Sequence, residues 1–182
     1  MLLALAIAAI ILSLAVPKTM SAVDEMRTAT AARYLASRIT GARLQALQRS
    51  TCVALRFEAV GNDYWFATHV DGNRNGVRTR DIANGSDWVL VAGERLADRF
   101  PDVRFGLTPG VPDLDGARMS DEGDGVRVGS PRILTLSPDG TATSGTLYIR
   151  GRQGQYAVRV LGATARTRVF RYDVGAGEWI AR

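Results

Sequence analysis

The N-terminal part of the sequence reads as one uninterrupted helix, and this feature constrains the fold most. Residues 1–16, MLLALAIAAIILSLAV, are apolar except for one serine. From residue 18 to residue 50 there is no proline and a single glycine, Gly41, and most residues are good helix formers. A proline inside a helix removes one hydrogen bond, so we expect Pro17 to kink the helix at most. The pattern predicts one helix over residues 1–50, roughly 75 Å long at 1.5 Å per residue.

The apolar first third of this helix predicts a membrane segment. As a helix, residues 1–16 span about 24 Å, slightly less than the roughly 30 Å hydrocarbon core of a bilayer. A cleaved secretory signal is the alternative, but no positive charge precedes the run, and Ser21-Ala22 is a poor cleavage site within a continuing helix. We therefore assign residues 1–22 to the membrane segment and residues 23–182 to a globular domain. For a simple anchor, the basic residues after the run would place this domain in the cytoplasm.

Farther along the helix, small and apolar side chains form a narrow stripe. They recur at spacings of three and four residues, which places them on one face: Ala31, Leu35, Ile39, Ala42 and Ala46. Small side chains let another helix approach closely. Together with the apolar first third, the stripe favours packing beside the helices of other subunits.

After residue 50 the period of apolar residues changes to two, which indicates β-strands. We expect strands at Cys52–Phe57, Tyr64–Val70, Val103–Leu107, Arg132–Leu136, Thr146–Arg150, Tyr156–Leu161, Thr167–Tyr172 and Glu178–Ile180. The segment Pro109–Ser130 is rich in Gly, Pro and Asp and predicts a long surface loop. The predicted fold class is α+β, with one antiparallel-sheet domain attached to one long N-terminal helix.

The composition argues against an enzyme. The chain has one cysteine, Cys52, and one histidine, His69, so it has no internal disulfide framework and no zinc site built from Cys and His. His69 ends a predicted strand and has no partner cluster near it in sequence. An acidic stretch is more typical of solvated surface than of paired catalytic carboxylates; it contains Asp113, Asp115, Asp121, Glu122 and Asp124. We expect no catalytic residues and no small-molecule substrate.

One loop has part of the pattern of a calcium site. Asp71, Asn73 and Asn75 offer oxygen ligands at positions one, three and five, and a glycine stands at position six. The acid expected at position twelve is replaced by Asp81 at position eleven, and three arginines interleave the ligands, so the affinity would be weak. A polar turn between strands is the alternative. Calcium is the one cofactor that the sequence suggests.

The C-terminal strands are basic. The net charge of the chain is +5, and all but one of its 23 basic residues are arginine. Arg166, Arg168 and Arg171 lie among aromatic residues, and the alternation of a strand places the first two on one face and Arg171 on the other. Arginine with exposed aromatic rings can hold a phosphate backbone without reading its sequence. Nucleic-acid binding is therefore one interpretation, and an ordinary solvated strand face is the other.

Four stretches together carry a resemblance to a known family. They are the apolar helix ending in Ala15-Val16-Pro17, the segment Ala42–Ser50 before the first strand, Leu134–Gly140 followed by Ser144-Gly145-Thr146, and the closing strands with Arg166–Val169. In this order they resemble the minor pseudopilins of type II secretion and type IV pili, the GspH/FimT-like proteins. The order of helix and sheet and the Ser-Pro-Asp-Gly turn are the most specific parts.

This resemblance implies a pilin-like fold, in which the long helix packs on the antiparallel sheet, and a structural function. The chain would be a minor pilin or pseudopilin, a single-pass inner-membrane protein whose helix binds other subunits in a fibre, with residues 1–22 first in the membrane and later in the fibre core. Its domain would lie on the periplasmic or extracellular side, opposite to the orientation that the charges suggest, and here we follow the resemblance. Some members bind DNA during uptake through a glycine-arginine-x-arginine motif. The matching positions here are Ala165-Arg166-Thr167-Arg168, with alanine in place of glycine.

The sequence departs from the family at its N-terminus. The family begins with a short basic leader, a glycine at the cleavage point, a methylated aromatic residue and a glutamate. Aligning Pro17 with the family's proline places that glutamate immediately before Met1. We expect that the start codon has been chosen too far downstream. The alternative is a variant that is not processed in the usual manner.

Overall fold

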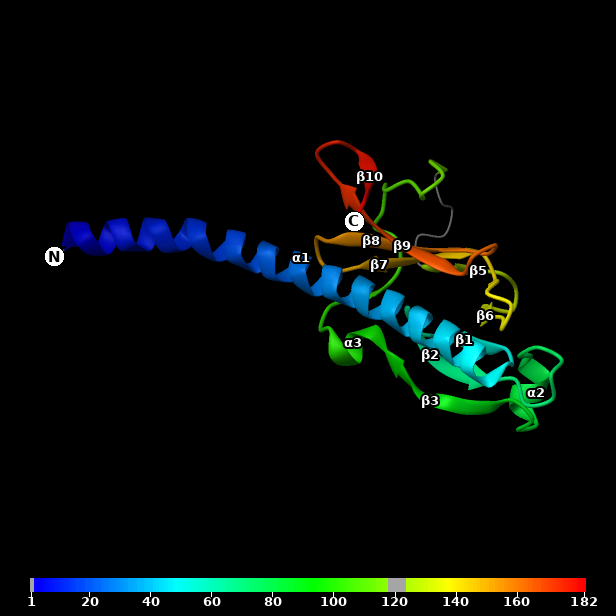
Figure 1. The fold of residues 1–182 in the computed structure, drawn as a ribbon. Helices are drawn as coiled ribbons and strands as arrows, with labels where there is room; N and C mark the ends of the chain where they lie inside the picture. Colours follow the sequence, from blue (N-terminus) through cyan, green and yellow to red (C-terminus); the bar gives the residue numbers. More distant parts are fainter. Residues whose placement is uncertain (1, 118–123) are drawn as a thin grey trace.

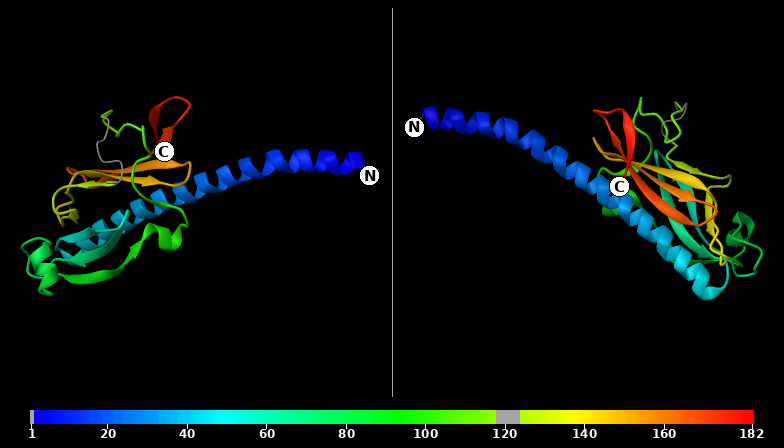
Figure 2. Two further views of the ribbon diagram at one scale, coloured as in Figure 1. Left: turned by 180° about the vertical axis from the view of Figure 1, so that it is seen from behind. Right: turned by 45° about the horizontal axis from the view of Figure 1, so that its top comes forward.

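A single long helix forms the spine of the molecule (Figure 1). The computed structural model describes residues 2–117 and 124–182, with side chains described from residue 19 onward. Helix α1 (Leu2–Arg49) has 48 residues and continues through Pro17, as predicted. Its N-terminal half projects from the domain and its C-terminal half lies along the sheets (Figures 1 and 2). Among the described residues, no helix combines the length and the apolar character needed to cross a membrane.

Two antiparallel sheets pack with the C-terminal half of α1. The first has the strand order β3-β2-β1-β6, and the second has the order β10-β9-β8-β7-β4, with β5 paired to β7. The strands of the first sheet are β1 (Val53–Val60), β2 (Asp63–Val70), β3 (Trp88–Arg95) and β6 (Ile133–Leu136). Those of the second are β4 (Arg104–Phe105), β5 (Val126–Val128), β7 (Gly145–Arg150), β8 (Gln155–Leu161), β9 (Arg166–Asp173) and β10 (Glu178–Ala181). Two short helices, α2 (Thr79–Ala83) and α3 (Leu96–Arg99), flank β3. The predicted α+β class, with one long helix on antiparallel sheet, is confirmed.

The alanine-rich stripe of α1 lies in the core of this domain. All five of its residues are buried, and Leu35 and Ile39 are fully covered. They belong to one cluster with apolar residues of both sheets, such as Leu55, Leu134 and Val158. The stripe is therefore not exposed to other subunits, and the interpretation that it serves packing between subunits was wrong.

Two further differences concern the sheets. Strand β3 was not predicted, because it is an edge strand whose pairing with β2 shifts register twice, so its side chains do not alternate cleanly between buried and exposed. Strand β5 lies within Pro109–Ser130, which was predicted to be loop throughout. It has only three residues, too few to show a period, and its pairing with Gly145–Leu147 in β7 holds it in the sheet.

Candidate functional site

The predicted calcium ligands are brought together in one loop after β2. Asp71 is 3% exposed. Its carboxylate accepts hydrogen bonds from the backbone N–H groups of Asn73 (3.2 Å), Asn75 (3.3 Å) and Gly76 (2.7 Å). The side-chain amide of Asn75 donates a hydrogen bond of 3.1 Å to the carboxylate of Asp81, which lies in α2. The loop is thus organised by carboxylates that bind N–H groups.

A third buried carboxylate, that of Asp87, completes this loop and was not counted among the ligands predicted from the sequence. It accepts hydrogen bonds from the backbone N–H groups of Gly72 (3.1 Å) and Arg78 (2.9 Å). The hydrogen bond from Asn75 lowers the pKa of Asp81. Within the described part of the chain, no three or more His, Cys, Asp or Glu side chains are grouped to hold a metal. Calcium binding by this loop stays a prediction.

The predicted nucleic-acid residues divide between the two faces of β9. Arg166 and Arg168 are exposed, whereas Arg171 is half-buried. The guanidinium of Arg171 forms an ion pair with Glu25 of α1 at 2.8 Å. The hydroxyl of Tyr156 also donates to Glu25, at 2.6 Å. Burial and this hydrogen bond raise the pKa of Tyr156 to about 12. Arg171 therefore links β9 to α1 and lies apart from the other two arginines.

The outer face of the second sheet carries a longer basic row than the sequence suggested. The strand register places Arg127, Thr146, Arg159 and Arg168 directly opposite one another across β5, β7, β8 and β9. Arg159 is held by Asp115 through two hydrogen bonds of 3.0 and 2.7 Å. Arg127 was not predicted to belong to this row, because its neighbours come from distant strands. Nucleic-acid binding by Arg166 and Arg168 stays a prediction.

The structure also shows what surrounds His69, Cys52 and the acidic stretch. His69 is 4% exposed in β2, and its burial and the nearby charge of Arg56 lower its pKa. Burial raises the pKa of Cys52, which favours the neutral thiol. Of the acidic stretch, Asp113 accepts hydrogen bonds from two backbone N–H groups of its own turn, those of Asp115 and Ala117. Asp124 accepts a hydrogen bond from Tyr64 and pairs with Arg132, and Asp121 and Glu122 lie outside the described residues.

Helix α1 is fixed to the second sheet by one carboxylate near the point where the helix leaves the domain. Asp24 is 6% exposed and accepts hydrogen bonds from the backbone N–H groups of Arg152 (3.0 Å), Gln153 (2.8 Å) and Gly154 (3.1 Å) in the β7–β8 turn. Burial alone would raise the pKa of Asp24, but these three hydrogen bonds and the charge of Arg152 bring it below its usual value. The turn comes so close that a Cβ on Gly151 would lie 2.2 Å from Oγ1 of Thr28.

The face of α1 opposite the buried stripe is exposed. Five residues lie along the middle of this face, with an apolar side chain at each end of the row and polar ones between them: Met26, Thr30, Arg33, Ser37 and Leu44. Met26 is 69% exposed and Leu44 is 53% exposed. Of these five residues, Arg33 alone is charged. The spacing of three, four and seven residues that places them on one face is visible in the sequence, but the alanine-rich stripe is the stronger apolar signal.

The comparisons with known proteins give one structural likeness. No family model matches the sequence, and none of the curated proteins matches it. Among solved structures, the chain is similar to the minor pseudopilin EpsH from the type 2 secretion system of Vibrio cholerae, with a TM-score of 0.49 and 11% sequence identity. The match covers 80% of this chain and 97% of that chain. Both values are too low to carry an inference about function.

Proposed function

We propose that the chain is a minor pilin or pseudopilin of the GspH/FimT-like type. It is a structural subunit that joins a fibre by placing α1 beside the helices of other subunits, in a type II secretion pseudopilus or a type IV pilus. Before assembly, residues 1–22 anchor it in the inner membrane with the domain on the periplasmic side. The subunit has no catalytic role in this proposal.

The observation that carries this proposal is the division of α1 into two faces. One face is buried against both sheets, so the domain holds the helix rigidly. The opposite face is exposed and nearly uncharged, and the N-terminal half of the helix extends beyond the domain (Figure 2). A rigid helix with one free face and a projecting end is suited to lateral packing in a bundle of helices.

Charged substitutions on the exposed face of α1 test this function. We expect the double variant Met26→Asp/Leu44→Asp to reduce the amount of the chain in fibres sheared from the producing cells by tenfold or more, because unpaired carboxylates would be buried between helices. The measurement is an immunoblot of sheared fibres against total protein.

A matched control is available on the domain surface. Val60, at the end of β1, is 49% exposed, and Val174, just after β9, is 77% exposed, so neither belongs to the exposed face of α1. The variant Val60→Asp/Val174→Asp introduces the same charge and should enter fibres as the unchanged chain does. Normal incorporation of the α1 variant would contradict the proposal, provided that both variants unfold at the same temperature.

A further inference from the structure

The exposed side of α1 follows a seven-residue repeat. Eight residues along its middle are spaced alternately by three and four positions, and each of them is exposed: Val23, Met26, Thr30, Arg33, Ser37, Thr40, Leu44 and Leu47. We call this row the seam. A mean spacing of 3.5 residues is the pattern by which one helix packs along another in a coiled coil. Neither sheet covers the seam, because both sheets pack on the buried stripe of the helix (Figure 2).

The seam has apolar ends and a polar middle. Val23 and Met26 at one end are 40% and 69% exposed, and Leu44 and Leu47 at the other end are 53% and 45% exposed. Burial of these four side chains by a second helix would be favourable. Between them stand three residues with a hydroxyl group and one charged residue, Arg33. A charged residue in the core of a helix pair selects the partner, because burying it without an opposite charge is strongly unfavourable.

Arg33 is not paired with any other described residue. Its side chain forms no hydrogen bond and no ion pair within the part of the chain that the structure describes. The residues one helical turn away in either direction are uncharged: Ala29, Thr30, Ala36 and Ser37. A helix that covers the seam therefore has to supply the charge that balances Arg33.

The two acidic residues of α1 face the chain's own domain. Asp24 is buried and accepts hydrogen bonds from the backbone N–H groups of the β7–β8 turn. Glu25 forms an ion pair with Arg171 and accepts a hydrogen bond from Tyr156. The sequence of α1 contains no other aspartate or glutamate. If two copies of the chain packed through their seams, no register of the two helices would place a carboxylate opposite Arg33.

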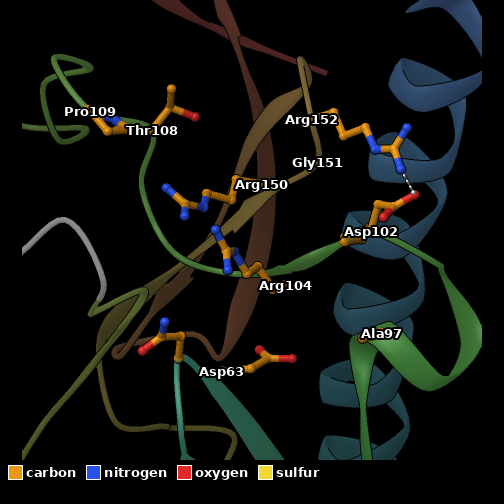
Figure 3. Close-up of a pocket in the computed structure, with 11 residues that line it drawn as sticks. Asp63, Ala97, Asp102, Arg104, Thr108, Pro109, Arg150, Gly151 and Arg152 are labelled. Atoms are coloured by element: carbon orange, nitrogen blue, oxygen red, sulfur yellow. Dashed lines mark ion pairs between the residues drawn. The ribbon is translucent and has the colours of Figure 1, made fainter. Parts of the chain in front are cut away.

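The exposed side of α1 carries charge of one sign. In the part of α1 whose side chains the structure describes, the exposed charged residues are all arginines: Arg27, Arg33 and Arg49. Asp102 of the domain lies beside α1, but it forms an ion pair with Arg152 at 3.1 Å (Figure 3). Asp102 and Arg152 line a cavity of about 360 Å³ together with Arg27. A helix surface with positive charge alone is complementary to a partner with negative charge.

We propose that the seam binds an α-helix of a different subunit that carries an aspartate or glutamate opposite Arg33. A guanidinium and a carboxylate form paired hydrogen bonds, so the position of this acid also fixes the register of the two helices. A second copy of the chain does not fit, because its helix offers Arg33 no carboxylate. Arg33 thus selects which subunit stands next to the chain, an inference that rests on the proposed packing of α1 in a fibre.

The first test supplies the acidic helix as a variant of the chain itself. Two helices that run side by side in the same direction bring position 33 of one opposite position 33 of the other. A mixture of the unchanged chain with Arg33→Glu therefore pairs opposite charges, whereas either chain alone opposes like charges. We expect the mixture to associate at least tenfold more tightly than either chain alone. Sedimentation equilibrium of the full chains in a non-ionic detergent measures this association.

A matched control reverses a charge outside the seam. Arg166 is exposed on β9, and a mixture of the unchanged chain with Arg166→Glu should associate no more tightly than the unchanged chain alone. Absence of association between the unchanged chain and Arg33→Glu would overturn the inference. Self-association of the unchanged chain that is as tight as this mixture would overturn it as well.

The second test separates this inference from the proposed function. In sheared fibres, Arg33→Glu should lower the amount of the chain by tenfold or more, and Arg33→Lys, which keeps the charge, should stay within twofold of the unchanged chain. If Arg33→Glu enters fibres normally while Met26→Asp/Leu44→Asp does not, the inference falls and the proposed function stands. If both variants enter normally, both fall.

Discussion

Truncating Leu35 to alanine is expected to lower the free energy of unfolding by about 3 kcal/mol. Leu35 is fully buried at the middle of the α1 stripe, in the cluster that joins the helix to both sheets. The lost side chain leaves a cavity that the long rigid helix cannot close by moving, because the rest of the stripe holds it in place. Chemical denaturation of the full chain in detergent, followed by tryptophan fluorescence, measures the change.

The same substitution on the other side of the helix is the matched control. Leu44 is 53% exposed on the face that the sheets do not cover. Leu44→Ala should change the free energy of unfolding by less than about 0.5 kcal/mol. Equal losses of unfolding free energy for Leu35→Ala and Leu44→Ala would mean that the helix does not pack on the sheets by the face that carries Leu35.

Replacing Asp24 with alanine is expected to cost about 3 kcal/mol, because three backbone N–H groups lose a charged acceptor in a largely buried turn. Asp24→Asn should lose less, since the amide oxygen still accepts a hydrogen bond. Glu178→Ala, which removes an exposed acid from β10, should have little effect. A loss for Asp24→Ala no larger than that of Glu178→Ala would show that the turn does not depend on α1.

The lowered pKa of Asp24 also predicts a dependence on pH. Burial opposes the ionised form, but the three N–H donors and Arg152 outweigh it, so the pKa in the folded chain lies below its value of about 3.9 in the unfolded chain. The stability that this carboxylate contributes is complete above the unfolded pKa and is lost as the pH falls through the folded pKa. Acidification below pH about 4 should therefore destabilise the unchanged chain more than Asp24→Asn. If the free energy of unfolding fell with pH in the same way for the unchanged chain and for Asp24→Asn, this prediction would be contradicted.

The parts of the fold that were predictable have a local signal. The 3.6-residue period of α1 and the alternation in strands such as β8 need only neighbouring residues to be visible. Strand β3 has no such signal, because its two register shifts break the alternation, and β5 is too short. The periodicity of α1 also showed which residues of the helix are buried without showing what covers them. The stripe was therefore assigned to other subunits when the chain's own sheets occupy it.

The candidate sites were predictable only where the residues are close in sequence. The Asp71 loop was found because Asp71, Asn73 and Asn75 follow one another in sequence, whereas the more distant Asp87 was not counted among the predicted ligands. The basic row of the second sheet depends on the register between its strands, which no single stretch of sequence defines. The position of Asp24 under the β7–β8 turn has a faint signal in Gly151 and Gly154, since side chains there would collide with α1.

The central claim is that the exposed face of α1 contacts other subunits, and photo-cross-linking tests it most directly. A photoreactive residue would be placed at Met26 or Leu44 on this face, and at Val174 on the domain surface as the control, in the full chain within its native fibres. The account predicts that positions 26 and 44 cross-link to the N-terminal helices of other pilin-like subunits, identified by mass spectrometry, and that position 174 does not. Cross-links from position 174 alone, or none from α1 in fibres that contain the chain, would contradict it.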